Sequence, residues 1–132
     1  MSARARQYVL RVHGEFAAAH VLRGYPGACE RIHGHTWKVE AEVVAHELDH
    51  LGMAIDFREL HRILDGVLAD LDHRLLNDVP PFTDLNPTAE HVAAYVHGRM
   101  GHLLSALPPP HVQLVSVTVR ENDRSSVTVS ES

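Results

Sequence analysis

The stretch HGHTWKVEAEVVA, residues 33–45, alternates between apolar and polar side chains along its length. Successive side chains of a β-strand point to opposite faces of the sheet, so this alternation predicts a strand. One face of the strand carries His33, His35, Trp37, Val39, Ala41 and Val43. The other face carries Thr36, Lys38, Glu40 and Glu42. Two histidines therefore share the apolar face.

A second alternating stretch precedes this strand, from Gln7 to His20. As one continuous strand, it places on one face Tyr8, Leu10, Val12, Phe16, Ala18 and His20. The segment between the two stretches contains the turn-forming residues 23–27, RGYPG. We expect a hairpin with a long loop, in which His20 lies on the same face as the two later histidines.

The middle of the chain changes to helical spacing. From Asp56, which is suited to be an N-cap, the apolar stripe consists of Phe57, Leu60, Ile63, Leu64, Val67, Leu68 and Leu71. This stripe predicts an amphipathic helix of about 15 residues. Pro80 and Pro81 exclude a continuation, and Thr88 then offers the N-cap of a second helix. Its apolar stripe consists of Val92, Tyr95, Val96, Met100, Leu103 and Leu107.

Alternation returns after the prolines at 108–110. Between His111 and Glu121, one face carries Val115, Val117, Val119 and Glu121. A further alternating stretch, Ser125–Ser130, follows the turn residues Asn122 and Asp123. The predicted order is ββααββ, an α+β fold. The length of 132 residues fits a single domain, 1–132.

Composition excludes several classes of protein. The net charge is −5, with one lysine and eleven arginines, so no basic field favours nucleic acid or an anionic membrane surface. No apolar run approaches the roughly 18 residues that span a bilayer. The single cysteine cannot form an internal disulfide, and the first residues lack the apolar stretch of a secretion signal. A cytoplasmic protein is therefore expected.

Histidine is overrepresented, with 12 residues, and three of them have metal-site spacing. His33 and His35 point to the same side of one strand, and His20 is the natural third ligand from its neighbour. Three imidazoles with an open fourth position are typical of catalytic zinc. The alternative is that an HxH pair in a histidine-rich chain is incidental. The histidines without such partners are His13, His46, His50, His61, His91, His97, His102 and His111.

Four other residues are candidates for chemistry. Cys29 lies in the loop before His33, where a nearby cation would lower its thiol pKa; the alternative is an inert buried thiol. Asp72 and His73 form a pair at the predicted end of the first helix, where capping is the alternative role. Glu121 closes a row of valines, so it either meets a specific donor or marks the exit of the strand into solvent.

Six ordered motifs together resemble one family. They are FxAAH at 16–20, CxxxHGH at 29–35, GMxIDF at 52–57, LDHxxLN at 71–77, PTAE at 87–90, and the strand that ends at Glu121. Over nearly its full length the chain resembles the 6-carboxytetrahydropterin synthase and 6-pyruvoyl tetrahydropterin synthase family. The resemblance implies a T-fold, in which an antiparallel sheet is backed by two helices. It also implies trimers that close their sheets into a barrel and pair into homohexamers.

The resemblance also implies roles for individual residues. The zinc ligands would be His20, His33 and His35; the proton-transfer groups would be Cys29, Asp72 and His73; and the substrate would meet Glu121, Thr88 and Glu30. Glu121 would anchor a pterin ring, whose guanidine-like edge of N–H donors suits a carboxylate. Zinc would hold the side-chain hydroxyls of a dihydroneopterin and acidify the neighbouring C–H and O–H groups.

Spacing favours one branch of the family. Three residues between Cys29 and His33 resemble the bacterial carboxytetrahydropterin synthases of queuosine biosynthesis, whereas the 6-pyruvoyl-forming enzymes usually have a longer insert. Glu30 also resembles a branch that forms 6-hydroxymethyl-dihydropterin for folate, which implies a dual activity as an alternative. Where many members carry lysine before the cysteine, this chain has Ala28. That departure leaves open the cation that lowers the thiol pKa. The arginines that could meet the triphosphate are Arg23, Arg31 and Arg124.

Rival classes fit the sequence less well. The spacing from Gly27 through His33 and His35 to Glu40 matches much of a cupin metal motif. However, strand alternation turns Glu40 away from both histidines, and two helices occupy the middle of the chain, where an all-β jelly roll needs strands. A non-catalytic zinc-binding scaffold would leave Cys29 and the remaining candidates without a shared purpose.

Overall fold

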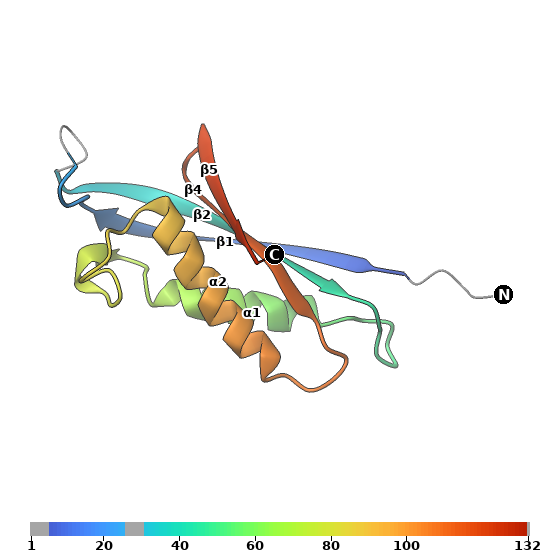
Figure 1. Ribbon diagram of the computed structural model, residues 1–132. Helices are drawn as coiled ribbons and strands as arrows, with labels where there is room; N and C mark the ends of the chain where they lie inside the picture. Colours follow the sequence, from blue (N-terminus) through green and yellow to red (C-terminus); the bar gives the residue numbers. More distant parts are fainter. Residues whose placement is uncertain (1–5, 26–30, 132) are drawn as a thin grey trace.

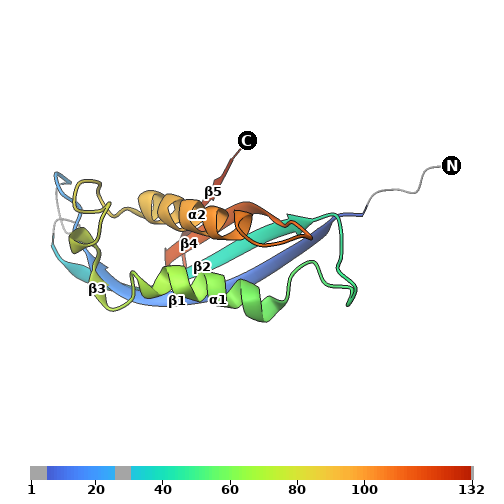
Figure 2. The same cartoon turned by 90° about the horizontal axis from the view of Figure 1, so that it is seen from below.

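The computed structural model describes residues 6–25 and 31–131 and has a five-stranded sheet with two helices on one face (Figures 1 and 2). The strands are β1 (Tyr8–His20), β2 (His33–Ala45), β3 (Arg74–Leu75), β4 (Gln113–Asn122) and β5 (Ser125–Ser130). The helices are α1 (Phe57–Ala69) and α2 (Ala89–Ser105), with a short 3₁₀ helix at Leu76–Asp78. The sheet order is β3-β1-β2-β4-β5, and all pairs are antiparallel except β1 with β3. The α+β class is confirmed.

The hairpin predicted from the two alternating stretches is confirmed. β1 and β2 pair along their whole length, with Tyr8 opposite Ala45 and His20 opposite His33. Ala18 lies opposite His35 in the same register. The register therefore brings all three predicted ligands to one end of the hairpin.

Both predicted N-caps are confirmed. The Asp56 carboxylate accepts a hydrogen bond from Arg58 N at 2.8 Å, and the Thr88 hydroxyl accepts one from His91 N at 3.1 Å. The first helix is shorter than its apolar stripe, because it ends at Ala69. Leu71 is fully buried in the turn that follows, so it continues the apolar stripe without being helical.

The short strand β3 was not predicted from the sequence. Its two residues, Arg74 and Leu75, pair in parallel with Ala18 and Ala19 at the outer edge of β1. A strand of two residues has no alternation to detect, and its place depends on β1, which is distant in sequence. The missed strand bears directly on the site, because it follows Asp72 and His73.

The core lies between the helix-covered face of the sheet and the two helices. The largest fully buried side chains there include Trp37, Phe16, Leu60, Leu64 and Met100. Gly14 permits α1 to approach β1 closely, since a Cβ at this position would lie 2.9 Å from Leu68 Cδ1. None of the helices in the described part of the chain has the length and apolar character needed to cross a membrane.

Candidate metal centre and active site

Three histidines form a cluster at one end of the β1–β2 hairpin. One ligand nitrogen from each of His20, His33 and His35 lies within 4.8 Å of the others. The ring centroids are 4.5 Å apart for His20 and His33, 5.3 Å for His20 and His35, and 4.9 Å for His33 and His35. The sequence prediction that these residues come together is confirmed.

Backbone carbonyls fix which nitrogens of two rings face the cluster. Nδ1 of His20 lies 2.7 Å from the Pro87 carbonyl oxygen, and Nδ1 of His33 lies 2.8 Å from that of Arg31. A carbonyl oxygen only accepts hydrogen bonds, so each Nδ1 carries the proton. The Nε2 atoms of His20 and His33 are therefore lone-pair donors, the arrangement found in metal-binding histidines with a second hydrogen-bond partner.

The cluster contains unpartnered buried nitrogens. Nε2 of His20 and Nε2 of His35 are both buried and have no hydrogen-bond partner among the described residues. Buried polar atoms are nearly always paired, so two such atoms in one cluster indicate a missing ligand. Three neutral imidazoles fit a divalent metal ion, and three protein ligands leave a coordination position open.

The environment of His20 favours the neutral ring that a metal requires. Its side chain is 1% exposed, and burial lowers its pKa below the ordinary 6.5. The Pro87 carbonyl and the Glu121 carboxylate act in the opposite direction but do not reverse the shift. His20 is therefore held unprotonated at neutral pH.

The Trp37 indole packs against two rings of the histidine cluster. The indole is fully buried, with its ring centroid 4.9 Å from that of His20 and 5.7 Å from that of His35. The indole Nε1 donates to the Ala18 carbonyl at 3.2 Å, and the ring stacks on Phe16 with a centroid distance of 5.7 Å. The alternation had placed Trp37 on this face without indicating that it packs against two ligand rings.

Glu121 reaches the cluster from β4. Its Oε2 lies 3.6 Å from Nε2 of His35. The same side chain lines a cavity of about 250 Å³ between the start of α2, at Ala89 and Glu90, and the β4–β5 hairpin. Glu121 therefore lies beside the cluster with a side chain that is 28% exposed, and its role as a substrate anchor stays a prediction.

Thr88 is placed by its capping role. Its hydroxyl accepts the His91 N–H, so the first turn of α2 holds this side chain. A substrate contact for Thr88 stays a prediction.

The Asp72–His73 pair lies on the outer edge of β1. Asp72 Oδ1 accepts from Ala17 N at 2.9 Å, and Asp72 Oδ2 lies 2.9 Å from Nδ1 of His73. His73 has a φ of 58°, a left-handed conformation that directs its own N–H to the Ala17 carbonyl at 2.6 Å. The Ala17 N–H first, and then His73, lower the pKa of Asp72 below 3.8. The pair is therefore held as a carboxylate beside an imidazole.

This pair is separate from the histidine cluster but near it. Within residues 6–25 and 31–131, no hydrogen bond, ion pair or ring contact joins Asp72 or His73 to the three histidines. However, one open hollow on the surface is lined by both His73 and His35, together with residues 17–19. The fold of one chain therefore brings the predicted proton-transfer pair close to the cluster but leaves the pair on the surface.

Two predicted site residues, Cys29 and Glu30, lie outside the described residues. Of the three arginines considered for the triphosphate, Arg23 has a structural role. Its guanidinium donates to the carbonyls of Phe82 and Leu85, at 2.8 and 3.3 Å. Arg31 and Arg124 are exposed.

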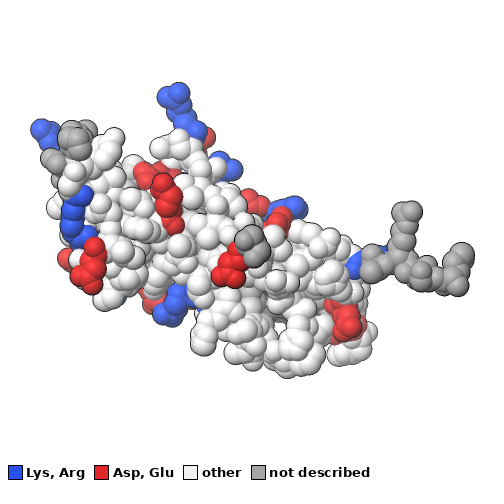
Figure 3. All heavy atoms as spheres, in the orientation of Figure 1, with Lys and Arg blue, Asp and Glu red and all other residues white. Residues whose placement is uncertain are grey.

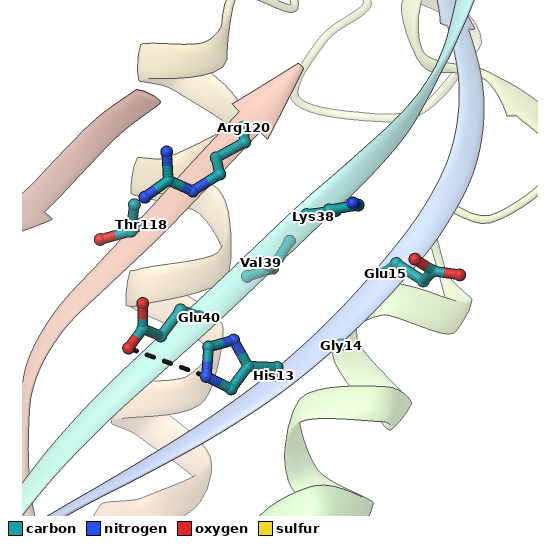
Figure 4. A pocket seen from close by; sticks show the side chains of 8 residues that line it. All are labelled: His13, Gly14, Glu15, Lys38, Val39, Glu40, Thr118 and Arg120. Carbon is teal, nitrogen blue, oxygen red and sulfur yellow. Dashed lines mark ion pairs between the residues drawn. The ribbon is translucent and has the colours of Figure 1, made fainter. Parts of the chain in front are cut away.

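The helix-free face of the sheet has a different character. Figure 4 shows a hollow on it lined by His13, Gly14, Glu15, Lys38, Val39, Glu40, Thr118 and Arg120. His13 Nε2 lies 3.9 Å from Glu40 Oε1, and this hollow contains none of the predicted site residues. Basic and acidic side chains are interspersed on the face drawn in Figure 3.

The position of Glu40 also removes the cupin alternative. Glu40 lies on the helix-free face, opposite to the histidines, and two helices cover the sheet. A cupin site needs the carboxylate beside the histidines within an all-β fold.

The comparisons with known proteins agree with this geometry. The family model described as 6-pyruvoyl tetrahydropterin synthase matches residues 9–132. The chain belongs to this family of enzymes. A 6-carboxy-5,6,7,8-tetrahydropterin synthase of Bacillus subtilis is 36% identical over 114 residues, covering 83% of this chain and 75% of the relative. A dihydroneopterin monophosphate aldolase of Pyrococcus furiosus is 38% identical over 85 residues, covering 64% and 68%.

A solved structure supports the fold in detail. The 6-pyruvoyl tetrahydropterin synthase of Caenorhabditis elegans superposes with a TM-score of 0.83 at 27% identity, covering 99% of this chain and all of that chain. The T-fold expected for the subunit is thereby confirmed. The family resemblance inferred from the six motifs is confirmed as well.

Proposed function

We propose that this chain is a zinc-dependent 6-carboxy-5,6,7,8-tetrahydropterin synthase. The reaction converts 7,8-dihydroneopterin triphosphate and water to 6-carboxytetrahydropterin, acetaldehyde and triphosphate, as a step of queuosine biosynthesis. The observation that carries the proposal is the three-histidine cluster with the Glu121 carboxylate 3.6 Å from His35. The Bacillus subtilis relative that bears this name supports it.

The three histidines would hold the metal through the nitrogens that face one another. For His20 and His33 this nitrogen is Nε2, since each Nδ1 donates to a carbonyl. When bound, zinc supplies Lewis-acid polarisation of the substrate hydroxyl oxygens. The fully buried Trp37 ring packs edge-to-face against the His20 and His35 rings and would hold them in place.

Glu121 would anchor and orient the pterin. Its two carboxylate oxygens can accept the ring N–H and the exocyclic amino group together, as in other bidentate pairs. The cavity that Glu121 lines lies beside the cluster. A pterin ring held in this cavity would direct the side chain of the substrate toward the three histidines.

Proton transfers would be divided between two groups. Cys29 is the proposed acceptor of the carbon-bound proton, and the Asp72–His73 pair serves the other transfers. The hydrogen bonds from Ala17 and His73 keep Asp72 ionised, so it can stabilise a protonated His73. Thr88 and Glu30 are proposed substrate contacts on the basis of their motifs.

The functional unit would be a homohexamer, a dimer of trimers in which sheets close into a barrel. Supporting this, β5 and the outer edge of β1 before Ala17 are both open edges of the sheet, which does not close on itself within residues 6–25 and 31–131. The proposed unit is one domain, 1–132, acting in the cytoplasm on a pterin triphosphate.

A second product has specific support. The Pyrococcus furiosus relative named as an aldolase, together with Glu30 in the sequence, favours a dual enzyme that also forms 6-hydroxymethyl-dihydropterin for folate. Formation of 6-pyruvoyl tetrahydropterin is the other alternative, because the family model carries that name.

The product test separates these alternatives directly. Purified zinc-loaded protein is incubated with 7,8-dihydroneopterin triphosphate, and the released aldehyde and the pterin are identified by mass spectrometry. We expect acetaldehyde with the carboxy product. Glycolaldehyde that still carries the triphosphate, released together with the hydroxymethyl product, would assign the aldolase activity. Formation of 6-pyruvoyl tetrahydropterin with no aldehyde would assign the pyruvoyl activity. No turnover of any kind would contradict the proposed function.

A further inference from the structure

The outer edge of β1 is the edge that pairs with β3. Hydrogen bonds continue along this edge on both sides of the short β3 pairing. At Ala17 the partners are Asp72 and His73, and at Ala18 and Ala19 the partner is β3. Past the end of β1, two asparagine side chains continue the same pattern. The segment that follows β3 is thereby fastened along the edge of β1 as far as Arg23.

Each of the two asparagine side chains makes the two backbone hydrogen bonds that a residue of a neighbouring strand would otherwise make. Asn77 Oδ1 accepts from Val21 N at 3.0 Å, and Asn77 Nδ2 donates to Val21 O at 2.9 Å. Asn86 Oδ1 accepts from Arg23 N at 2.9 Å, and Asn86 Nδ2 donates to Arg23 O at 3.0 Å. An amide that both donates and accepts satisfies both backbone groups of its partner. We call Asn77 and Asn86 the asparagine clamp.

The clamp leads directly to the metal cluster through one residue. The Asn86 carbonyl accepts from Thr88 N at 2.8 Å, which closes a tight turn centred on Pro87, and it also lies 2.7 Å from Nδ1 of His91. The proline ring fixes φ in this turn. The direction of the Pro87 carbonyl, which meets His20 Nδ1 at 2.7 Å, is therefore set by Asn86 on one side and the cap of α2 on the other.

We propose that Asn86, assisted by Asn77, is a positioning residue of the metal centre. By fixing the Pro87 carbonyl, the asparagine clamp holds His20 as the Nδ1–H tautomer, with Nε2 directed at the cluster. This inference rests on the metal site of the proposed function. It assigns a role to side chains that do not themselves touch the cluster.

The experiment compares Asn86→Ala with the intact protein in two measurements. Zinc affinity is measured by competition with a chromophoric chelator. We expect it to weaken about 10-fold, the lower end of the loss that follows removal of a hydrogen-bond partner of a metal ligand, because the Pro87 carbonyl stays in the chain and only its direction is released. The tautomer of His20 is measured in ¹⁵N-labelled, metal-free protein from imidazole nitrogen shifts. We expect the Nδ1–H form in the intact protein and a mixture of tautomers in the variant.

The matched control is Val67→Ala. Val67 lies in the core on α1 and is 1% exposed, so its truncation lowers stability without touching the clamp. We expect its zinc affinity and His20 tautomer to equal those of the intact protein. Asn77→Ala should give a weaker version of the Asn86→Ala result, since Asn77 is farther from Pro87 along the chain.

The experiment separates a failure of this inference from a failure of the proposed function. Zinc affinity within twofold of the intact protein and an unchanged His20 tautomer in folded Asn86→Ala would overturn the inference. If Asn86→Ala does not fold, Asn86→Asp gives a second comparison, because it has the same shape, keeps the acceptor for Arg23 N and replaces the donor to Arg23 O with a charged oxygen. Failure of the intact protein to bind zinc would contradict the proposed function, while the tautomer measurement would still decide the role of the clamp.

Discussion

The two groups of candidate catalytic residues in this chain are held in opposite ways. The histidine cluster is packed on a fully buried tryptophan, and His20 is 1% exposed. The Asp72–His73 pair lies only a few residues away along β1, but His73 is 82% exposed and its position is fixed by backbone hydrogen bonds. One chain therefore brings the three candidate metal ligands together, whereas it presents the predicted proton-transfer pair on an exposed edge of the sheet.

The largest expected effect follows from removing a ligand of the cluster. Purified protein should hold about one zinc per chain, and His33→Ala should lose most of it, because two imidazoles do not complete a zinc site. Metal content by mass spectrometry checks this. The control is His13→Ala, on the helix-free face, which should keep its zinc. Unchanged zinc in His33→Ala would remove His33 from the site.

Trp37→Ala tests whether packing, and not only the ligands, makes the cluster. Truncating this fully buried indole should lower the free energy of unfolding by about 3–5 kcal/mol. The zinc affinity of the protein that remains folded should fall as well, since the His20 and His35 rings lose the indole against which they pack. Denaturant titration and chelator competition measure the two effects. Normal zinc affinity in a destabilised variant would show that the ligands alone set the site.

Glu121→Gln tests the neighbouring substrate anchor. An amide keeps the shape but presents N–H donors to the donors of the pterin, so pterin affinity should weaken by roughly 2–4 kcal/mol while zinc stays bound. Isothermal calorimetry with a pterin measures the change. An affinity within about threefold of the intact protein, well under 1 kcal/mol, would mean that Glu121 does not anchor the ring.

Asp72→Asn should have the smallest effect on the isolated fold, on the order of a few degrees in Tm. The folded-state pKa of Asp72 lies below 3.8, so its contribution to stability is present above that value and is lost as the pH falls through the lower folded value. The difference in Tm between the intact protein and the variant should therefore be greatest near neutral pH and vanish in acid. A Tm difference that stays constant with pH would show that the effect of Asp72→Asn does not come from the charge of the carboxylate.

Much of this fold was predictable because its signals are local. The alternation around Trp37 located the hairpin, and the caps Asp56 and Thr88 located both helix starts. The meeting of the three candidate metal ligands was predictable for the same reason, since strand alternation fixes the face of each histidine.

The supports of the cluster were not predictable in this way. The amide groups of Asn77 and Asn86 bond to backbone that is 56 and 63 positions away in sequence. The carbonyl of Pro87 has no side-chain signal at all, and the PTAE motif indicated a helix start and a substrate contact at Thr88 but no contact between Pro87 and His20. Such contacts arise from the meeting of two loops, which periodicity does not describe.

The outer edge of β1 also has a consequence for exchange with solvent. Ala17 directs its N–H and carbonyl outward to Asp72 and His73, and strand parity directs residues 9, 11, 13 and 15 outward as well. No partner for those earlier amides exists within residues 6–25 and 31–131. In deuterium labelling, alternate amides in the first half of β1 should therefore exchange rapidly in an isolated subunit, while those of Ala17, Val21 and Arg23 stay protected. Slow exchange along the whole strand would then report directly that another subunit covers this edge.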